Sequence, residues 1–242
     1  MHEAELAEIY DQAHRSRGKD YEGEAAQVTA LIRERFPQAA SLLDVACGSG
    51  AHLSFFQNHF GRVEGLELSE SMLAVARERL SAGLLHQGDM RSFRLERTFD
   101  AVTCMFGSIG YMPSVADLQS ALGCLARHTT PSGVVVVEPW WFAETFVDGY
   151  VSGALTTMGG RTIARVSHSV REGNVSRLRV HYVTASAEDG AQHFSETHDI
   201  TLFSREDYRN AFAQAGLVAQ YFEDVFSGRG LFVAVREGGD GP

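Results

Sequence analysis

The sequence is poor in cysteine and has no long apolar segment. Its three cysteines, Cys47, Cys104 and Cys124, are odd in number and show no C-x-x-C spacing. We therefore expect packed free thiols in a reducing cytoplasm. No stretch is long and apolar enough to span a bilayer, and the first residues lack the pattern of a signal peptide. The sequence thus predicts a cytoplasmic protein that has no membrane partner.

Positive charge is also scarce. The chain has 21 lysines and arginines against 31 aspartates and glutamates, a formal net charge of -10, and Lys19 is its only lysine. This negative charge argues against nucleic acid as the main partner. The sequence also shows no Ser-His-Asp set and no metal-ligand spacing, so neither a hydrolytic triad nor a metal site is expected.

The most informative stretch is residues 41–53. The apolar run at residues 42–45 predicts a buried parallel strand that leads into Gly48 and Gly50, where backbone can approach a ligand closely. The helix predicted next favours negative charge at its N-terminus. A dinucleotide fingerprint would need a third glycine at the position of Leu53, so NAD is disfavoured. Asp44 followed by x-x-C-G-S-G instead resembles motif I of class I S-adenosylmethionine (SAM) methyltransferases.

Three further segments follow in the order of that superfamily. Glu67 ends an apolar segment, and an acid at the tip of a second strand is placed to bind the two ribose hydroxyls of an adenosine. Asp89 and Met90 follow a third short strand, where the resemblance implies contacts to adenine. The segment at residues 99–106 resembles the fourth-strand motif beneath the methyl donor. We therefore expect SAM as the cofactor.

These motifs predict an α/β fold, a Rossmann-like class I methyltransferase sheet with an antiparallel β insertion after the fifth strand. A chain of 242 residues with 44% hydrophobic residues suits one domain with an inserted cap. We expect four segments. They are an N-terminal helical lid at residues 1–40, a SAM-binding core at 41–149, an insertion of about three strands at 150–203, and a C-terminal helix and hairpin at 204–242.

The predicted fifth strand ends in Trp140 and Trp141, at the edge of the sheet where α/β proteins bind ligands. In the insertion, one predicted face carries Arg165 together with some of the other basic residues, which are His168, Arg177, Arg179 and His181. Such residues commonly form a solvated polar face, but in a chain of this net charge they are candidates for binding an anionic substrate. A glycine on each side of Arg229 suggests a second phosphate-binding element.

Longer stretches narrow the resemblance to the TDP-amino-sugar N-methyltransferases. That resemblance covers nearly the whole chain and implies a homodimeric, SAM-dependent enzyme that methylates, or dimethylates, the amine of a TDP-linked amino deoxysugar in bacterial secondary metabolism. Relatives carry tyrosine or histidine at the position of Tyr111. The stretches that carry the resemblance are residues 18–21, 41–48, 86–91, 134–142, 165–169, 171–173 and 227–232.

The resemblance and the motifs together give a set of expected site residues. For SAM these are Tyr10, Arg17, Tyr21, Ala46, Gly48, Gly50, Glu67, Leu68, Met72, Asp89, Met90 and Met105. For the sugar nucleotide they are Trp140, Trp141, Arg165, His168, Arg171 and Arg229.

Methyl transfer to a neutral amine is an in-line displacement, so alignment and desolvation can supply much of the acceleration. The amine must lose a proton, which Tyr10, Tyr111 or a chain of waters could accept. Two alternatives remain: a methyltransferase of another small metabolite such as glycine, and a SAM-binding protein without turnover. The sequence does not decide whether the sugar amine is at C3 or C4.

Overall fold

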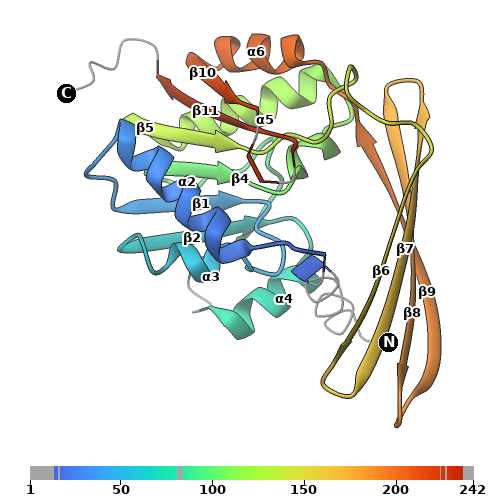
Figure 1. The fold of residues 1–242 in the computed structure, drawn as a ribbon. Helices are drawn as coiled ribbons and strands as arrows, with labels where there is room; N and C mark the ends of the chain where they lie inside the picture. The colour runs from blue at the N-terminus through green and yellow to red at the C-terminus, as the bar shows by residue number, and fades with distance from the viewer. Residues whose placement is uncertain (1–13, 16, 81–83, 224, 227, 237–242) are drawn as a thin grey trace.

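The computed structural model describes residues 14–15, 17–80, 84–223, 225–226 and 228–236. Its centre is a seven-stranded sheet in the order β10-β11-β5-β4-β1-β2-β3 (Figure 1). Five strands are parallel, and β11 runs antiparallel to both β5 and β10. The strands are β1 (Ser41–Val45), β2 (Arg62–Glu67), β3 (Leu85–Gln87), β4 (Phe99–Cys104), β5 (Thr129–Val137), β10 (Leu217–Phe222) and β11 (Leu231–Arg236).

Helices cover both faces of this sheet, and the alternation of side chains along a strand explains how. In β1, Leu42 points into a core shared with α2 and α3, whereas Leu43 and Val45 point into a core shared with α5 and α6. All three side chains are fully buried, which stabilises the fold by about 1.5–3 kcal/mol each. The helices are α2 (Tyr21–Arg35), α3 (Leu53–Phe56), α4 (Glu70–Arg79), the 3₁₀ turn η2 (Ser108–Tyr111), α5 (Val115–Arg127) and α6 (Arg205–Gln214).

The insertion forms a separate four-stranded antiparallel sheet in the order β6-β7-β8-β9. The expectation of about three strands was one too few, because β6 consists largely of small and hydroxyl residues whose alternation is weak. In Figure 1 this sheet stands beside the core, at the end to which the parallel strands point. Its strands are β6 (Tyr150–Met158), β7 (Arg161–Glu172), β8 (Val175–Ser186) and β9 (Gly190–Thr201).

The remaining predictions about the fold concern two helical segments, the cysteines and membrane crossing. The helix expected after the glycine loop is a single short element, α3, followed by turns. The first part of the expected helical lid, residues 1–13, lies outside the described residues. All three cysteines are buried free thiols. Within the described part of the chain, no helix has the length and apolar character needed to cross a membrane.

Candidate cofactor and substrate site

A cavity of about 1190 Å³ lies between the carboxyl ends of the parallel strands and the inner face of the second sheet. Its volume exceeds the range typical of a pocket for one small molecule, so it can hold two ligands at once. The sequence-predicted residues on its walls are Arg17, Tyr21, Ala46, Gly48, Glu67, Met72, Met105, Tyr111, Trp140, Trp141, Arg165 and Arg229. Tyr10 lies outside the described residues.

The loop after β1 adopts a conformation that ordinary residues avoid. Ala46 has φ of 58° and Gly48 has φ of 56°, both in the left-handed region. A Cβ built at Gly48 would meet no atom within 4 Å, so this glycine faces open space in the cavity. Gly50 differs, because its Cβ would lie 3.0 Å from Leu80 Cδ1. Gly50 therefore serves packing against α4 and does not line the cavity.

Glu67 at the tip of β2 joins two loops. Its carboxylate accepts backbone N–H groups from Gly48 at 2.9 Å, from Leu68 at 2.8 Å and from Ser69 at 2.9 Å. These hydrogen bonds fix the acid beside the glycine loop, at the cavity wall. The side chain of Leu68 is 63% exposed and does not line the cavity.

Asp44, the acidic residue of the first motif, is buried at the carboxyl end of β1. Its carboxylate accepts a hydrogen bond of 2.7 Å from the Thr103 hydroxyl of β4. Burial raises its pKa to about 6, although His52 and this hydrogen bond act in the opposite direction. Asp44 lines the cavity and belongs to the candidate site, which the predicted set did not include.

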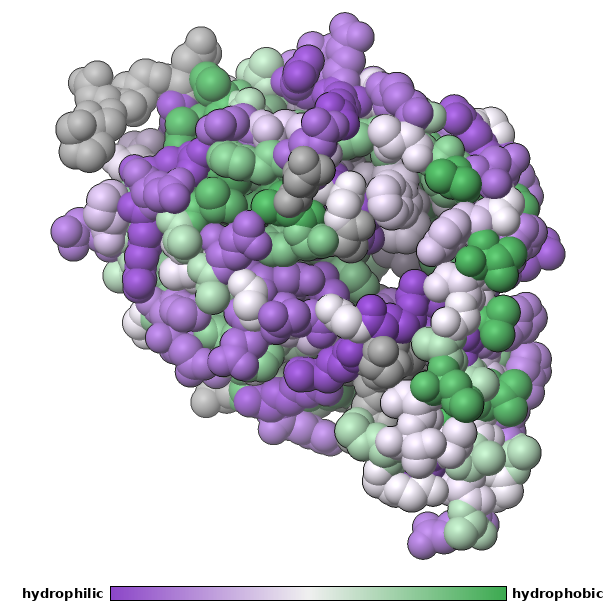
Figure 2. All heavy atoms as spheres, viewed as in Figure 1, coloured by the Kyte–Doolittle hydropathy of each residue, from purple (hydrophilic) through white to green (hydrophobic). Residues whose placement is uncertain are grey.

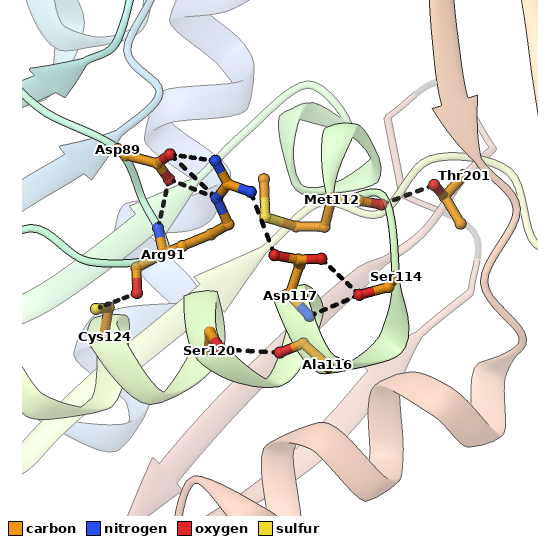
Figure 3. Close-up of polar contacts among 9 residues, drawn as sticks. All are labelled: Asp89, Arg91, Met112, Ser114, Ala116, Asp117, Ser120, Cys124 and Thr201. Atoms are coloured by element: carbon orange, nitrogen blue, oxygen red, sulfur yellow. Dashed lines mark hydrogen bonds and ion pairs between the residues drawn. The ribbon is translucent and has the colours of Figure 1, made fainter.

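Asp89 and Met90 are not on the cavity wall. Figure 3 shows the Asp89 carboxylate turned toward Arg91, whose guanidinium donates to both of its oxygens at 2.6–3.0 Å. These hydrogen bonds hold the pKa of Asp89 below its usual range. Arg91 also contacts Asp117 of α5 at 3.2 Å, and Met90 packs against the core. The adenine role of Asp89 and Met90 stays a prediction.

A buried cluster of charges closes the floor of the cavity. Glu24 Oε2 lies 2.6 Å from Lys19 Nζ and 2.8 Å from His52 Nε2, so the only lysine of the chain anchors the start of α2. Lys19 Nζ also lies 3.9 Å from Glu138 Oε2, and the other oxygen of Glu138 pairs with Arg229. None of these five side chains is more than 10% exposed. The cluster joins the segment before α2 to the end of β5 and to the turn before β11.

Glu138 is the centre of that cluster. It follows β5, is 1% exposed and accepts the Phe106 N–H at 2.7 Å. Burial alone would raise its pKa, but the charges of Arg229 and Lys19 outweigh burial and hold the pKa of Glu138 below its usual range. Arg229, for which the sequence predicts phosphate binding, is thus tied to a carboxylate in this structure.

Three buried donors on the wall lack an acceptor. Arg165 Nε, Arg229 Nε and Trp140 Nε1 have no hydrogen-bond partner among the described residues. Arg165 and Arg229 are 4% and 5% exposed, and the Arg229 guanidinium lies 5.2 Å from the centre of the Trp140 ring. Because buried polar groups are almost always hydrogen-bonded, these donors are suited to an anionic or oxygen-rich ligand.

The predicted grouping of basic residues on the insertion is wrong in part. In the β7–β8 register, Arg165 opposes Tyr182, whereas His168 opposes Arg179. Side chains three positions apart on a strand point to opposite faces, so His168 is exposed on the outer face. Arg177 and Arg179, which neighbour His168, share that outer face. Of the predicted arginines and histidines of the insertion, Arg165 alone lines the cavity.

Two further arginines make contacts that the sequence did not indicate. Arg171 is exposed and donates to the carbonyl oxygens of Gly173 at 2.9 Å and Ala143 at 2.8 Å, away from the cavity. Arg17 lines the cavity and donates to the Ser152 hydroxyl of β6 at 3.0 Å. Arg17 thus connects the segment before α2 to the second sheet.

Tyr111 faces the second sheet from the end of η2. Its hydroxyl lies 2.9 Å from His198 Nδ1, and His198 Nε2 lies 3.6 Å from Glu196 Oε2, both on β9. Tyr111 is 48% exposed as a whole residue, but partial desolvation of its hydroxyl raises its pKa to about 12, so the hydroxyl stays protonated at neutral pH. Sequence reasoning did not identify His198. Its place on the inner face of β9 depends on a strand register that local patterns do not reveal.

His14 also lines the cavity and packs edge-on against Phe106, with 4.9 Å between ring centres. Burial, followed by the charge of Arg165, lowers the pKa of His14 to about 3, so this imidazole is neutral. In the part of the chain that the structure describes, no group of three or more histidine, cysteine, aspartate or glutamate side chains could hold a metal ion.

Comparisons with known proteins agree with this geometry. A family model described as a methyltransferase domain matches residues 42–133. The dTDP-3-amino-3,4,6-trideoxy-alpha-D-glucopyranose N,N-dimethyltransferase of Streptomyces venezuelae is 54% identical over 97% of this chain and 99% of its own. The dTDP-3-amino-3,6-dideoxy-alpha-D-glucopyranose N,N-dimethyltransferase of Streptomyces fradiae is 54% identical over 96% of this chain and 91% of its own.

A solved structure is also similar along the whole chain. SAM-bound CalS10, an amino pentose methyltransferase from Micromonospora echinaspora involved in calicheamicin biosynthesis, superposes with a TM-score of 0.89. The two chains are 49% identical, and the match covers 95% of this chain and 97% of that one.

Proposed function

The chain belongs to the TDP-amino-sugar N,N-dimethyltransferases, a family of SAM-dependent enzymes, and from this premise we propose that it dimethylates the amine of a TDP-linked amino deoxysugar. One observation carries the proposal: a single cavity is lined both by a glycine loop with its acid and by buried donors that have no acceptor among the described residues. The loop and its acid fit an adenosine cofactor, and the donors fit an anionic substrate.

The residues in and beside the glycine loop fit SAM. The Glu67 carboxylate would accept the ribose hydroxyls, and the open side of Gly48 leaves room for the methionyl part. Met72 and Met105 offer apolar walls. When bound, SAM supplies a methyl group already activated by its sulfonium. The protein has to orient it, keep out water and present the amine in line.

The arginines and tryptophans on the cavity wall fit a diphosphate and a sugar. Arg165 Nε and Arg229 Nε would donate to phosphate oxygens, and Trp140 Nε1 to an oxygen of the sugar or of the phosphate. Trp141 adds a flat apolar wall beside them. Two dimethyltransferases that are 54% identical to this chain are named for 3-amino sugars, whereas one that is 45% identical is named for a 4-amino sugar. On the higher identity we propose the C3 amine as the acceptor.

The outer face of the second sheet supports a homodimer. Val151, Leu155, Val166 and Val183 share this face and are 46–73% exposed. Figure 2 shows hydrophobic residues gathered over this sheet. An apolar group of this kind on a sheet face is typical of a protein interface. We expect Leu155→Asp to convert the dimer to a monomer in sedimentation velocity, with Val218→Asp, at an exposed valine of the other sheet, as the control.

A reducing cytoplasm is the proposed compartment, since the three buried thiols are free. The enzyme would serve antibiotic or other secondary metabolism, as the pathway of the similar amino pentose methyltransferase suggests.

The decisive experiment incubates the protein with SAM and TDP-3-amino sugars and reads product masses. Two methyl increments support the proposal, and none, with SAM still bound, would leave a SAM-binding protein without turnover. Methylation of glycine in place of the sugar nucleotide would move the protein to another class.

Two matched variants test where the sugar nucleotide binds. We expect Arg165→Ala to raise the KM for the sugar nucleotide tenfold or more, since a charge-assisted hydrogen bond contributes about 1.5–3 kcal/mol. Arg179→Ala, on the neighbouring strand and the outer face, should leave this KM unchanged.

A further inference from the structure

The end of α4 contacts the glycine loop that follows β1. Arg79, the last residue of this helix, donates from Nη1 to the carbonyl oxygen of Ser49 at 3.2 Å and to its hydroxyl oxygen at 3.0 Å. At the next loop residue, a Cβ on Gly50 would lie 3.0 Å from Leu80 Cδ1 and 3.3 Å from Ala76 Cβ. Two successive loop residues are therefore held at the end of α4, one by hydrogen bonds and one by close packing.

The loop depends on such contacts because its backbone is unusual. Three of the five residues from 46 to 50 have positive φ, a conformation that persists where the surrounding structure imposes it. The Gly50 N–H donates to the Cys47 carbonyl oxygen at 3.0 Å. With Arg79 on the Ser49 carbonyl oxygen, both polar groups of the peptide bond that joins Ser49 to Gly50 are hydrogen-bonded.

Arg79 reaches the cavity through Ser49. Ser49 is 6% exposed and lines the cavity, whereas Arg79 is not on the cavity wall. The neighbouring loop residue is held by Glu67, whose carboxylate accepts the Gly48 N–H at 2.9 Å. The loop is thus fixed at Gly48 by the acid of β2 and at Ser49 by the arginine of α4.

These two contacts have different consequences for SAM. Glu67 would itself accept the ribose hydroxyls, whereas the loop at Gly48 leaves room for the methionyl part. A loop that already has the shape in which it binds its ligand avoids the free-energy cost of being ordered during binding. Holding the loop at Ser49 therefore favours ligands that carry this amino-acid part, and matters less to a ligand that has only the adenosine.

We propose that Arg79 is a positioning residue of the cofactor site, which holds the loop at Ser49 in the shape that receives the methionyl part of SAM. It acts through Ser49 and not by contact with the cofactor. This inference rests on the SAM cofactor of the proposed function and gives the end of α4 a role that the sequence motifs do not indicate.

The competing explanation is an arginine that only stabilises its helix. A positive charge in the last turn of a helix interacts favourably with the helix dipole, and α4 carries two such residues, Arg77 and Arg79. Arg77 pairs with Glu70 of the same helix. Arg77→Met therefore removes a charge from the same turn and leaves the hydrogen bonds of Ser49 in place, which makes it the matched control.

The test is calorimetric titration of three ligands into wild type, Arg79→Met and Arg77→Met. SAM and S-adenosylhomocysteine carry the amino-acid part, whereas 5′-methylthioadenosine lacks it. We expect Arg79→Met to weaken the first two about fivefold or more, as the loss of one or two hydrogen bonds implies. The third should stay within about twofold of wild type, and Arg77→Met should leave the affinities of all three unchanged.

Two results would overturn the proposal. Equal weakening of all three ligands in Arg79→Met would make the arginine a stabiliser of the fold alone, and an unchanged SAM affinity would leave it without a role in the site. If Arg79→Met is unfolded at the titration temperature, Arg79→Gln, a polar residue of good helix propensity, replaces it under the same criteria. A wild-type protein that binds none of the three ligands would refute the SAM assignment of the proposed function instead.

Amide hydrogen exchange adds a readout that needs no ligand. The Gly50 N–H is bonded to the Cys47 carbonyl oxygen, so its exchange rate reports whether the loop keeps its shape. We expect this amide to exchange severalfold faster in Arg79→Met and at the wild-type rate in Arg77→Met, while the amides of β1 keep their rates in both. An unchanged rate at Gly50 in Arg79→Met, or an equal rise at Gly50 and in β1, would contradict the positioning role.

Discussion

Arg229 is the residue at which structure changes a sequence-based expectation most. Its flanking glycines suggest that it binds phosphate, and a residue with that role alone could be removed without loss of stability. In the structure it pairs with Glu138, which is 1% exposed, and among the described residues the other cation within 4 Å of Glu138 is Lys19, at 3.9 Å. Removing Arg229 therefore leaves a buried carboxylate with one longer ion pair. We predict that Arg229→Met destabilises the fold and also weakens substrate binding.

The magnitude follows from the burial of the pair. Breaking a buried ion pair on one side costs about 3–5 kcal/mol. Because Lys19 remains, we expect a loss near the lower limit, about 3 kcal/mol. For a chain of this size each kcal/mol lowers the melting temperature by roughly 2–4 °C, so the expected fall is about 6–12 °C. Arg77→Met is the control. Its pair with Glu70 is largely exposed and contributes at most about 1 kcal/mol.

The pH dependence of this loss gives a second signature. In wild type the pKa of Glu138 is depressed, so its contribution is present above the unfolded value of 4.5 and lost as the pH falls through the lower folded value. In Arg229→Met, burial instead disfavours the charged form. The stability that Arg229→Met loses relative to wild type should be largest at pH 7–8 and should shrink as the pH approaches 4.5.

Thermal melts of ligand-free protein at pH 7.5 and pH 5 measure both effects. Adding Glu138→Gln should recover more than half of the loss, because a neutral amide can still accept the Phe106 N–H. A melting temperature within 2 °C of wild type, together with a raised KM for the sugar nucleotide, would refute the bracing role. Arg229 would then be a substrate ligand alone.

Three further predictions test the site. Glu67→Gln should weaken SAM binding tenfold or more in calorimetry, and unchanged affinity would remove Glu67 from the site. Asp44→Asn should raise the melting temperature of ligand-free protein more at pH 8 than at pH 5. The folded-state pKa of Asp44 is raised to about 6, so the ionised carboxyl destabilises the fold increasingly as the pH rises from the unfolded-state pKa through 6. An effect of the same size at both pH values would contradict this. Lys19, the only lysine, should resist amine-reactive labelling until the fold is loosened, since it is 6% exposed; rapid labelling in the native state would contradict its place in the buried cluster.

The core of the fold could be predicted from sequence because its signals are local. The strand, glycine loop and acid at residues 41–67 each occupy one short segment, and their order fixes the sheet. Alternation could also have separated Arg165 from His168, since their spacing of three places them on opposite faces of a strand. The predicted grouping overlooked that parity.

The rest of the site depends on contacts between distant segments. Glu24 in α2, Glu138 after β5 and Arg229 before β11 meet only once the sheet is assembled. The single lysine and a glutamate within the apolar face of α2 are the signals that could have indicated a buried charge cluster. His198 gave no such signal, because its inner position depends on the register of four strands.

The distribution of charge also explains how a protein of net charge -10 can accept an anion. Most acids among the described residues are at least partly exposed, where salt screens a charge beyond about 8–10 Å. Arg165, Arg229 and Lys19 are at most 6% exposed, so screening by salt reaches them little. Two of these three cations line the cavity with an Nε that has no acceptor in the described protein, whereas the cluster's carboxylates are already paired. A diphosphate entering the cavity therefore meets local positive charge and free donors, and the acids of the outer surface bear more on solubility and approach than on its binding.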